Sequence, residues 1–470
     1  MNIYRFLQAL TLLLLSGQSI SGVEEVGADD FRVTNFGPAN DTFAFAARQD
    51  MAYNSADNEY FVIFLGRRPE APTSFDEFEV YGLRLTSSGA TIGDPILLTS
   101  VDGIGSAGGA PQNRRVVYDP NRNGYVLVYD AQDSEFGASS IDVYGRLITA
   151  SGQPLGPTFV IDSAAGVDAR PDVAVSTVSD EFLVVWERGD AVTGDRTIQA
   201  RRFDASNAQP VGGAMRVDTI DQFKGNPTVA YNRDDNQYLV AWTNNTFSPR
   251  LQVLTADGTA QLAQEVEYAT PGFFTSRSEI VYNPDLGEYF IAFAQSDPAE
   301  GMVAESYEMF GRRISAGGNP LGAGKFRISV SDFVDRFLRS GTNVDCGPGG
   351  QCLEAGRPGL AYVAAEQSYV VAWSGTVDLG GDGDREVIVR ALKAGVDPTP
   401  GADQTQISNM GSDDTNFGGF LPSIAASPQG VLALWWGDDN ANGGIDNKFE
   451  LWGQNLLLNV FANGFEGEDP

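Results

Sequence analysis

The chain contains no histidine among its 470 residues. This absence excludes Ser-His-Asp and Cys-His mechanisms, His-ligated zinc, copper and haem, and general-base catalysis by imidazole. Any enzymatic activity would have to use carboxylate, Tyr or Arg side chains instead. No spacing of such residues along the sequence marks out a catalytic pair, so we identify no catalytic residue and no cofactor-binding residue.

Basic residues are also scarce. Lys and Arg together number 31 against 62 Asp and Glu, which gives a formal net charge of −31. Such a chain repels phosphate backbones and anionic lipid head groups. We therefore expect a monomer that binds no nucleic acid and does not insert into a membrane.

Long apolar runs are absent after the first residues of the chain. The one apolar run, residues 6–15, follows Arg5 and precedes small polar residues. It is shorter than the ~20 residues needed to span a bilayer, a pattern typical of a cleaved export signal. We predict a signal peptide at residues 1–22, cleaved after Ser21 or Gly22, and a soluble mature protein that is extracellular or periplasmic.

Cysteine is nearly absent as well. The two that exist, Cys346 and Cys352, lie six positions apart in a segment rich in Gly and Pro. A redox pair has the tighter C-x-x-C spacing, and two thiols without histidine make a poor zinc site. Because oxidising compartments permit disulfides, we predict that these two residues staple a surface loop.

What the chain does contain is a repeated aromatic register. Six times an aromatic or β-branched residue is followed seven positions later by Tyr or Phe, and four positions after that by another aromatic. The triplets are Tyr53/Tyr60/Phe64, Tyr118/Tyr125/Tyr129, Val175/Phe182/Trp186, Tyr231/Tyr238/Trp242, Tyr282/Tyr289/Phe293 and Tyr362/Tyr369/Trp373. A seventh copy, Val431 to Trp435, keeps the four-residue step. A repeated unit of this kind buries its faces by stacking on its neighbours.

Each repeat follows one plan of four strands. The first ends at the first aromatic, and after a polar turn such as 232–236 the second strand, such as 238–242, is apolar on both faces. That pattern indicates a strand covered on both sides. The third strand carries a Tyr-Gly-x-Arg signature, as at 143–146, and the fourth is short. Four antiparallel strands in each of seven units predict an all-β, seven-bladed β-propeller.

The two ends of the repeat region distinguish a closed ring from an open solenoid. The seventh unit lacks a convincing fourth strand, whereas residues 31–35 (Phe-Arg-Val-Thr-Asn) precede the first unit and match the fourth strand at 326–329. We predict that this N-terminal strand pairs into blade 7 and closes the ring, which removes an exposed sheet edge. The propeller then spans residues 23–461, and residues 462–470 form a C-terminal tail.

The repeat pattern resembles a known group of proteins. The order Tyr-Asn, Asn-x-Tyr-x-Val-x-Trp, Tyr-Gly-x-Arg, Gly-x-Pro-Leu-Gly and Phe-x-Ile-Ser is similar to repeats of exported bacterial β-propeller proteins, and it covers nearly all of residues 31–458. Residues 460–466 resemble a terminal segment of exported proteins from some Gram-negative bacteria. The resemblance implies the fold and export, and it carries no activity. The Asp-box of sialidases is missing.

Loop lengths divide the two faces of the predicted ring. The turns within the strand 1–2 and strand 3–4 hairpins are short, whereas the strand 2–3 loops and the connections between blades vary widely. Both variable sets emerge on one face because strands alternate in direction. We interpret this variable-loop face as the binding surface, since function concentrates in loops on a rigid scaffold. Neutral insertion explains the same variation equally well.

Two of these loops are acidic and rich in glycine, as calcium loops are. The candidate calcium ligands are Asp438, Asn440, Asn442, Asp446 and Glu450 in blade 7, and Asp378, Asp382 and Asp384 in blade 6. Glu450 falls one position later than an EF-hand requires, and no helices flank the loop. An ordinary Asp/Asn/Gly turn is the alternative.

The sequence leaves three classes of function open. The leading hypothesis is an exported, non-enzymatic propeller that binds a protein, a glycan or a cell-surface component through its variable-loop face. The alternative is a His-independent carbohydrate-active enzyme, either a glycoside hydrolase or a polysaccharide lyase. The third is a structural envelope protein without a discrete ligand. The repeated aromatics lie in doubly covered strands, so we predict that they form the core and do not stack on sugars.

Overall fold

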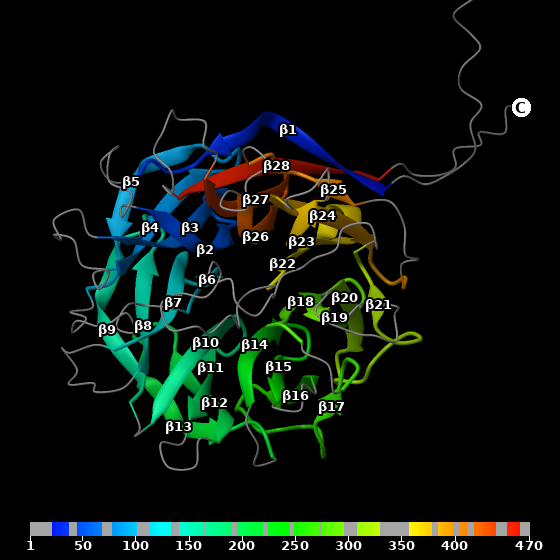
Figure 1. The fold of residues 1–470 in the computed structure, drawn as a ribbon. Helices are drawn as coiled ribbons and strands as arrows, with labels where there is room; N and C mark the ends of the chain where they lie inside the picture. Colours follow the sequence, from blue (N-terminus) through cyan, green and yellow to red (C-terminus); the bar gives the residue numbers. More distant parts are fainter. Residues whose placement is uncertain are drawn as a thin grey trace, which may run out of the picture.

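In the computed structural model, seven four-stranded antiparallel sheets form a ring around a common axis (Figure 1). This confirms the predicted seven-bladed β-propeller. The structure describes residues 21–36, 45–67, 78–100, 113–132, 141–163, 166–189, 195–219, 224–244, 249–271, 275–295, 308–329, 357–377, 384–397, 404–410, 418–438 and 449–460. Within these residues the single helix is the short 3₁₀ turn η3 (Ala364–Glu366). None of the described helices is long and apolar enough to cross a bilayer.

The blades follow one another along the chain, with the first-named strand of each nearest the axis. Blade 1 consists of β2 (Ala46–Asn54), β3 (Glu59–Arg67), β4 (Phe78–Thr86) and β5 (Thr91–Leu97), and blade 2 of β6 (Arg114–Asp119), β7 (Gly124–Ala131), β8 (Asp142–Thr149) and β9 (Pro154–Asp162). Blade 3 consists of β10 (Val167–Ser176), β11 (Glu181–Gly189), β12 (Arg196–Asp204) and β13 (Pro210–Arg216), and blade 4 of β14 (Lys224–Asn232), β15 (Gln237–Asn244), β16 (Pro249–Thr255) and β17 (Val266–Glu267). Blade 5 consists of β18 (Glu279–Asn283), β19 (Glu288–Gln295), β20 (Glu308–Ser315) and β21 (Phe326–Arg327), and blade 6 of β22 (Gly359–Val363), β23 (Ser368–Val377), β24 (Asp384–Lys393) and β25 (Thr405–Gln406). Blade 7 consists of β26 (Gly418–Ser427), β27 (Gly430–Asp438), β28 (Glu450–Val460) and the N-terminal β1 (Ser21–Arg32).

The aromatic register forms the core, as predicted. Its first two members are direct cross-strand partners, such as Tyr231 on β14 and Tyr238 on β15. The third member is inaccessible to solvent, as Trp186, Trp242 and Trp373 show. Full burial of such a side chain contributes about 2–3 kcal/mol, so the register stabilises every interface between blades. The rings of these third members are unavailable to an external ligand.

The glycine of the third-strand signature is required by packing. A Cβ at Gly311 would lie 2.6 Å from Cζ of Phe290 and 2.7 Å from Cε2 of Phe326, the aromatic of the fourth strand. The fourth-strand ring therefore lies directly on the third-strand backbone, which only glycine permits. Gly453 accommodates Phe31 in the same way, with the Phe31 ring 3.0 Å from the position of an added Cβ.

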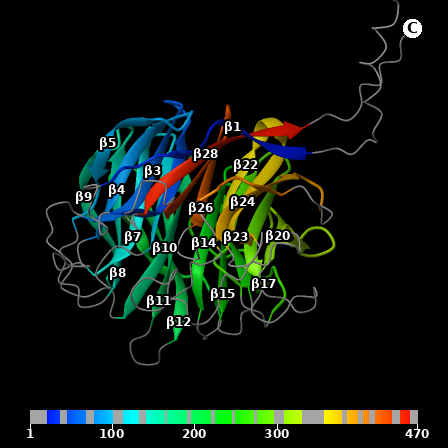
Figure 2. The same cartoon turned by 45° about the horizontal axis from the view of Figure 1, so that its top comes forward.

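The N-terminal strand closes the ring. β1 pairs antiparallel with β28 from Ser21↔Val460 to Val26↔Asn455 and again at Phe31↔Gly453. The two strands run side by side at the edge of blade 7 (Figures 1 and 2). The pairing confirms the predicted closing strand but begins ten residues earlier, at Ser21. A bulge that contains Gly27 (φ +94°) separates this first paired stretch from the second one at Phe31.

A buried hydrogen-bond cluster, here called the closure clasp, fixes the end of this segment. Thr34 Oγ1 donates to Glu450 Oε2 at 2.6 Å, and the backbone N–H of Phe36 donates to both Glu450 oxygens at 3.0 Å. Arg32 Nη2 forms an ion pair with Glu450 Oε1 at 3.0 Å. The backbone N–H of Leu451 donates to Thr34 Oγ1 at 2.9 Å. The clasp therefore joins the first described segment of the chain to the last strand.

Blade 5 contains the same arrangement within one continuous stretch of chain. Ser329 Oγ donates to Glu308 Oε2, the backbone N–H of Met309 donates to Ser329 Oγ at 2.9 Å, and Arg327 pairs with Glu308. Thr34 and Arg32 thus occupy the places of Ser329 and Arg327. The match between residues 31–35 and 326–329 is confirmed at the level of individual contacts.

Candidate functional site

The inner strands bring polar residues together around the axis. Each blade places one residue at the position three before the first residue of the aromatic register, or before its cross-strand equivalent in blade 7. These residues are Asp50, Arg115, Asp172, Thr228, Glu279, Gly359 and Ser423. Arg357, just before β22, joins them. A cavity of about 180 Å³, here called the central cavity, is lined by the charged members of this set and by Gly359 and Ser423.

The charged side chains of the central cavity pair with one another across blades. Arg115, only 5% exposed, lies 3.7 Å from Asp50 and 3.4 Å from Asp172, and it pairs with Glu279. Arg357 pairs with Asp50 at 3.3 Å and also with Glu279. Burial raises the pKa of Asp50 and raises that of Glu279 to about 7. Burial lowers the pKa of Arg115, but the surrounding carboxylates outweigh this effect and raise it.

Two of the three carboxylates hold the backbone of the next blade. Asp50 Oδ2 accepts a hydrogen bond from the Val116 N–H at 3.0 Å, and Asp172 Oδ2 accepts one from the Val229 N–H at 3.0 Å. Glu279 differs, because both of its arginine partners contact Oε1 and no described residue donates to Oε2. The cluster is therefore chiefly an inter-blade tie, with a single carboxylate oxygen available for proton exchange.

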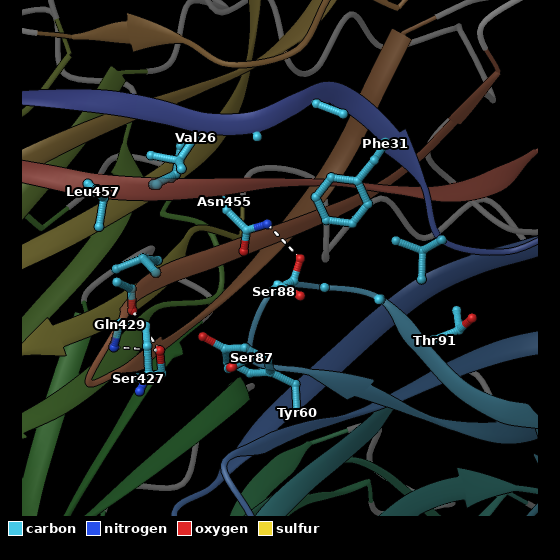
Figure 3. Close-up of a pocket in the computed structure, with 18 of the residues that line it drawn as sticks. Val26, Phe31, Tyr60, Ser87, Ser88, Thr91, Ser427, Gln429, Asn455 and Leu457 are labelled. Atoms are coloured by element: carbon cyan, nitrogen blue, oxygen red, sulfur yellow. Dashed lines mark hydrogen bonds between the residues drawn. The ribbon is translucent and has the colours of Figure 1, made fainter.

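A larger cavity of about 660 Å³, here called the closure groove, lies at the junction of blades 7 and 1 (Figure 3). Three parts of the chain form its walls. The lining consists of residues 26–28 and 31–33 from the N-terminal segment, Tyr60 and 87–91 from blade 1, and Ser427, 429–431 and 455–457 from blade 7. The blade 7 part is more than 300 residues away in the sequence from the other two, and it meets them only because the ring closes.

The lining of the closure groove combines apolar surface with hydroxyl and amide groups. Val26 is 39% and Leu457 41% exposed, and Phe31 lines the same groove. Asn455 Nδ2 donates to the carbonyl oxygen of Ser88 at 2.8 Å, which links β28 to the blade 1 turn (Figure 3). Burial raises the pKa of the Tyr60 hydroxyl to about 12.

Among the described residues, none that lines the closure groove is acidic. Its one charged side chain is Arg32, whose guanidinium is held by Glu450 at 3.0 Å and by the Thr34 carbonyl at 2.8 Å. A neutral groove is unusual in a chain with a net charge of −31. The groove therefore suits an uncharged ligand with apolar and hydrogen-bonding surfaces.

The groove lies on the face opposite the one that loop lengths indicated. Its walls include the strand 3–4 turn of blade 1 and the strand 1–2 turn of blade 7, both among the short turns. Much of the variable-loop face falls outside the described residues, so binding there stays a prediction.

Sequence reasoning missed the groove because no local pattern joins its three walls. It also missed the charged residues of the central cavity, although the sequence shows Asp50, Arg115, Asp172 and Glu279 three positions before the first residue of the aromatic register.

The candidate calcium ligands are only partly covered by the structure. Asp438 ends β27 and is buried, Asp384 begins β24, and Glu450 begins β28. Both oxygens of Glu450 accept hydrogen bonds in the closure clasp, which accounts for this buried carboxylate without a metal. Asn440, Asn442, Asp446, Asp378 and Asp382 lie outside the described residues, as do Cys346 and Cys352. Within the described part of the chain, no group of three or more His, Cys, Asp or Glu residues is placed to hold a metal ion.

Comparisons with known proteins agree with the fold. No family model matches the chain, and no curated protein matches its sequence. The BP39L lectin from Burkholderia pseudomallei aligns with a TM-score of 0.51 at 12% identity, over 88% of this chain and 99% of the lectin. The Trypanosoma rangeli sialidase gives a TM-score of 0.43 at 9% identity, over 92% of this chain and 59% of the sialidase. At 12% identity the similarity to the lectin supports the β-propeller fold alone, and the sialidase, with a TM-score under 0.5, adds nothing to it.

Proposed function

We propose that this chain is a non-enzymatic β-propeller that binds a glycan in the closure groove. The observation that carries the proposal is the lining of the groove, where Phe31, Val26 and Leu457 occur together with hydroxyl and amide groups and the described residues include no carboxylate. Saccharides present C–H faces to apolar surfaces and hydroxyl edges to polar groups. A volume of about 660 Å³ also falls within the ~300–1,000 Å³ typical of ligand sites. The name of the BP39L lectin makes glycans the first ligand class to test.

A second candidate function is a carbohydrate-active enzyme that uses the central cavity. It is favoured by Glu279, whose pKa of about 7 suits a general acid or base at neutral pH. Hydrolysis of a glycoside normally requires a second free carboxylate. Asp50 and Asp172 are engaged by backbone amides and by Arg115, which supports the non-enzymatic proposal over this alternative.

The proposal also includes export of the protein and stabilisation by calcium, both of which were expected from the sequence. The apolar run at residues 6–15 supports export, and the acidic, glycine-rich loops support calcium as a stabilising ion on the variable-loop face. Thermal melting with and without EDTA tests the second part. An unchanged melting temperature would remove calcium from the proposal and leave glycan binding in place.

A glycan array probed with the purified mature protein tests the central claim. Two exposed leucines provide a matched pair of variants, because Leu457 lines the groove and Leu155 on β9 does not. We expect Leu457→Ala to weaken binding about tenfold or more, since it removes apolar contact area, and Leu155→Ala to bind as the parent does. Turnover of a bound polysaccharide would favour the enzyme, and an array without any signal would reject the proposal.

A further inference from the structure

We propose that the closure groove takes a neutral saccharide and that this ligand holds the N-terminal strand β1 in the ring. The inference rests on the proposed function, because it specifies the ligand class of the same groove and the consequence of its binding. Two separate observations support it. One is the charge of the groove, and the other is the origin of its walls.

The charge of the groove selects against ionised sugars. An acidic saccharide would lose hydration on entering, and the charge of Arg32 is already balanced by Glu450 at 3.0 Å, with Nε and Nη2 also donating to the Thr34 carbonyl and to Asn35 Oδ1. The net charge of −31 adds long-range repulsion. An amino sugar would find no carboxylate among the described lining residues. A neutral saccharide avoids both penalties.

The walls of the groove make binding depend on ring closure. The N-terminal segment supplies Val26, Phe31 and Val33, while blades 1 and 7 supply the remaining lining. Phe31 is seated against Gly89 of the blade 1 turn, where an added Cβ would overlap its ring. When β1 detaches from β28, one wall of the groove is lost, so the open ring has no complete site. A ligand of the closed ring alone must stabilise that closed ring.

The closure clasp controls the same equilibrium from outside the groove. Thr34 and Glu450 are buried and are not among the lining residues. Thr34→Val preserves the shape of the side chain and removes both hydrogen bonds of the hydroxyl, to Glu450 and from the Leu451 N–H. This variant therefore loosens β1 without altering a ligand contact. Ser329→Ala in blade 5 is the matched control, because it removes the equivalent two bonds away from the groove.

Hydrogen exchange followed by mass spectrometry, combined with calorimetric titration, provides the test. The probes are maltotriose, mannotriose and galactotriose as neutral saccharides, with trigalacturonic acid as the ionised counterpart. At a concentration of 100 Kd, a neutral trisaccharide is expected to slow exchange of the β1 amides by about 100-fold, and to leave the β21 amides unchanged. Thr34→Val is expected to speed β1 exchange about tenfold or more, and the trisaccharide to restore protection. Ser329→Ala should leave β1 unaffected.

The outcomes separate the inference from the proposed function. A neutral trisaccharide that binds without protecting β1, or tighter binding of trigalacturonic acid, would overturn the inference and leave glycan binding standing. Binding that Leu457→Ala does not weaken would place the ligand elsewhere and overturn the inference as well. Failure of all four probes together with a blank glycan array would overturn both.

Discussion

Blades 5 and 7 carry the same contacts on different chain connections. In blade 5, residues 308–329 supply the third and fourth strands in succession, and Ser329 and Glu308 are 21 residues apart. In blade 7 the corresponding residues, Thr34 and Glu450, are 416 residues apart. The aromatic ring on the third-strand glycine and the arginine–glutamate pair are also repeated. Side-chain contacts are therefore independent of how the chain connects them.

Connectivity still affects the cost of forming these contacts. Joining ends 416 residues apart, in place of 21, costs about 2–3 kcal/mol more in loop-closure entropy for a flexible chain. Blade 7 must offset this with contacts alone, because its outer strand is not tethered by a hairpin to β28. The closure groove opens at the same junction. We infer that the seam between β1 and β28 is the point at which this ring opens first.

Removing the closing segment should have the largest effect on stability, because blade 7 then loses its fourth strand. Deletion of residues 23–36 eliminates the buried side chains of Val23, Val33 and Phe36 together with the closure clasp. We expect a loss of about 10 kcal/mol and a sharply lower melting temperature, measured by differential scanning calorimetry. A synthetic peptide of residues 23–36 should restore stability when added in trans. A melting temperature equal to that of the parent would refute closure by β1.

The pH dependence of the unfolding free energy distinguishes the central cavity from the seam between β1 and β28. The pKa of Glu279 is raised from 4.5 to about 7, so the folded protein binds this proton more tightly than the unfolded chain. Stability from this group is present below pH ~4.5 and is lost as pH rises toward 7, by about 3 kcal/mol. Glu279→Gln should flatten that part of the stability curve in urea titrations. If the difference between the two proteins does not vary from pH 5 to 8, the central cavity does not control this proton.

Matched changes in the two clasps should sharpen the comparison. Thr34→Val and Ser329→Ala each leave a buried backbone N–H and a buried carboxylate without one partner, at a cost of about 2 kcal/mol. The global loss, measured by urea unfolding, should be similar for the two. Limited proteolysis should differ, because only Thr34→Val loosens a strand, β1, that no hairpin joins to its neighbour β28. Equal cleavage rates near residue 30 in both variants would mean that blade 7 is no weaker than blade 5.

The sequence predicted whatever is repeated along it and little of what the ring brings together. The aromatic register identified the blades and the core because Tyr, Phe and Trp recur at fixed spacing in buried strands. Residues 31–35 were recognised as a closing strand because they copy blade 5. The pairing of Ser21 to Val26 was missed, although Val26-Gly27 repeats the Leu321-Gly322 of the blade 5 turn. The closure groove depends on contacts between distant segments, for which a single sequence holds no signal.

Two turn glycines offer the smallest and most specific comparison. Gly89 and Gly258 both have positive φ, of +85° and +87°, and each lies against a fourth-strand side chain of the preceding blade. An Ala at either position adds backbone strain of about 1 kcal/mol. At Gly258 the neighbour is the flexible end of Met215, which can move aside, whereas at Gly89 it is the rigid ring of Phe31. We therefore expect Gly89→Ala to cost about 1–2 kcal/mol more than Gly258→Ala and to speed exchange of the β1 amides. Equal losses of unfolding free energy for the two variants in urea would show that the Phe31 ring moves away from Gly89 without cost. The packing between β1 and the blade 1 turn would then not be fixed at this point.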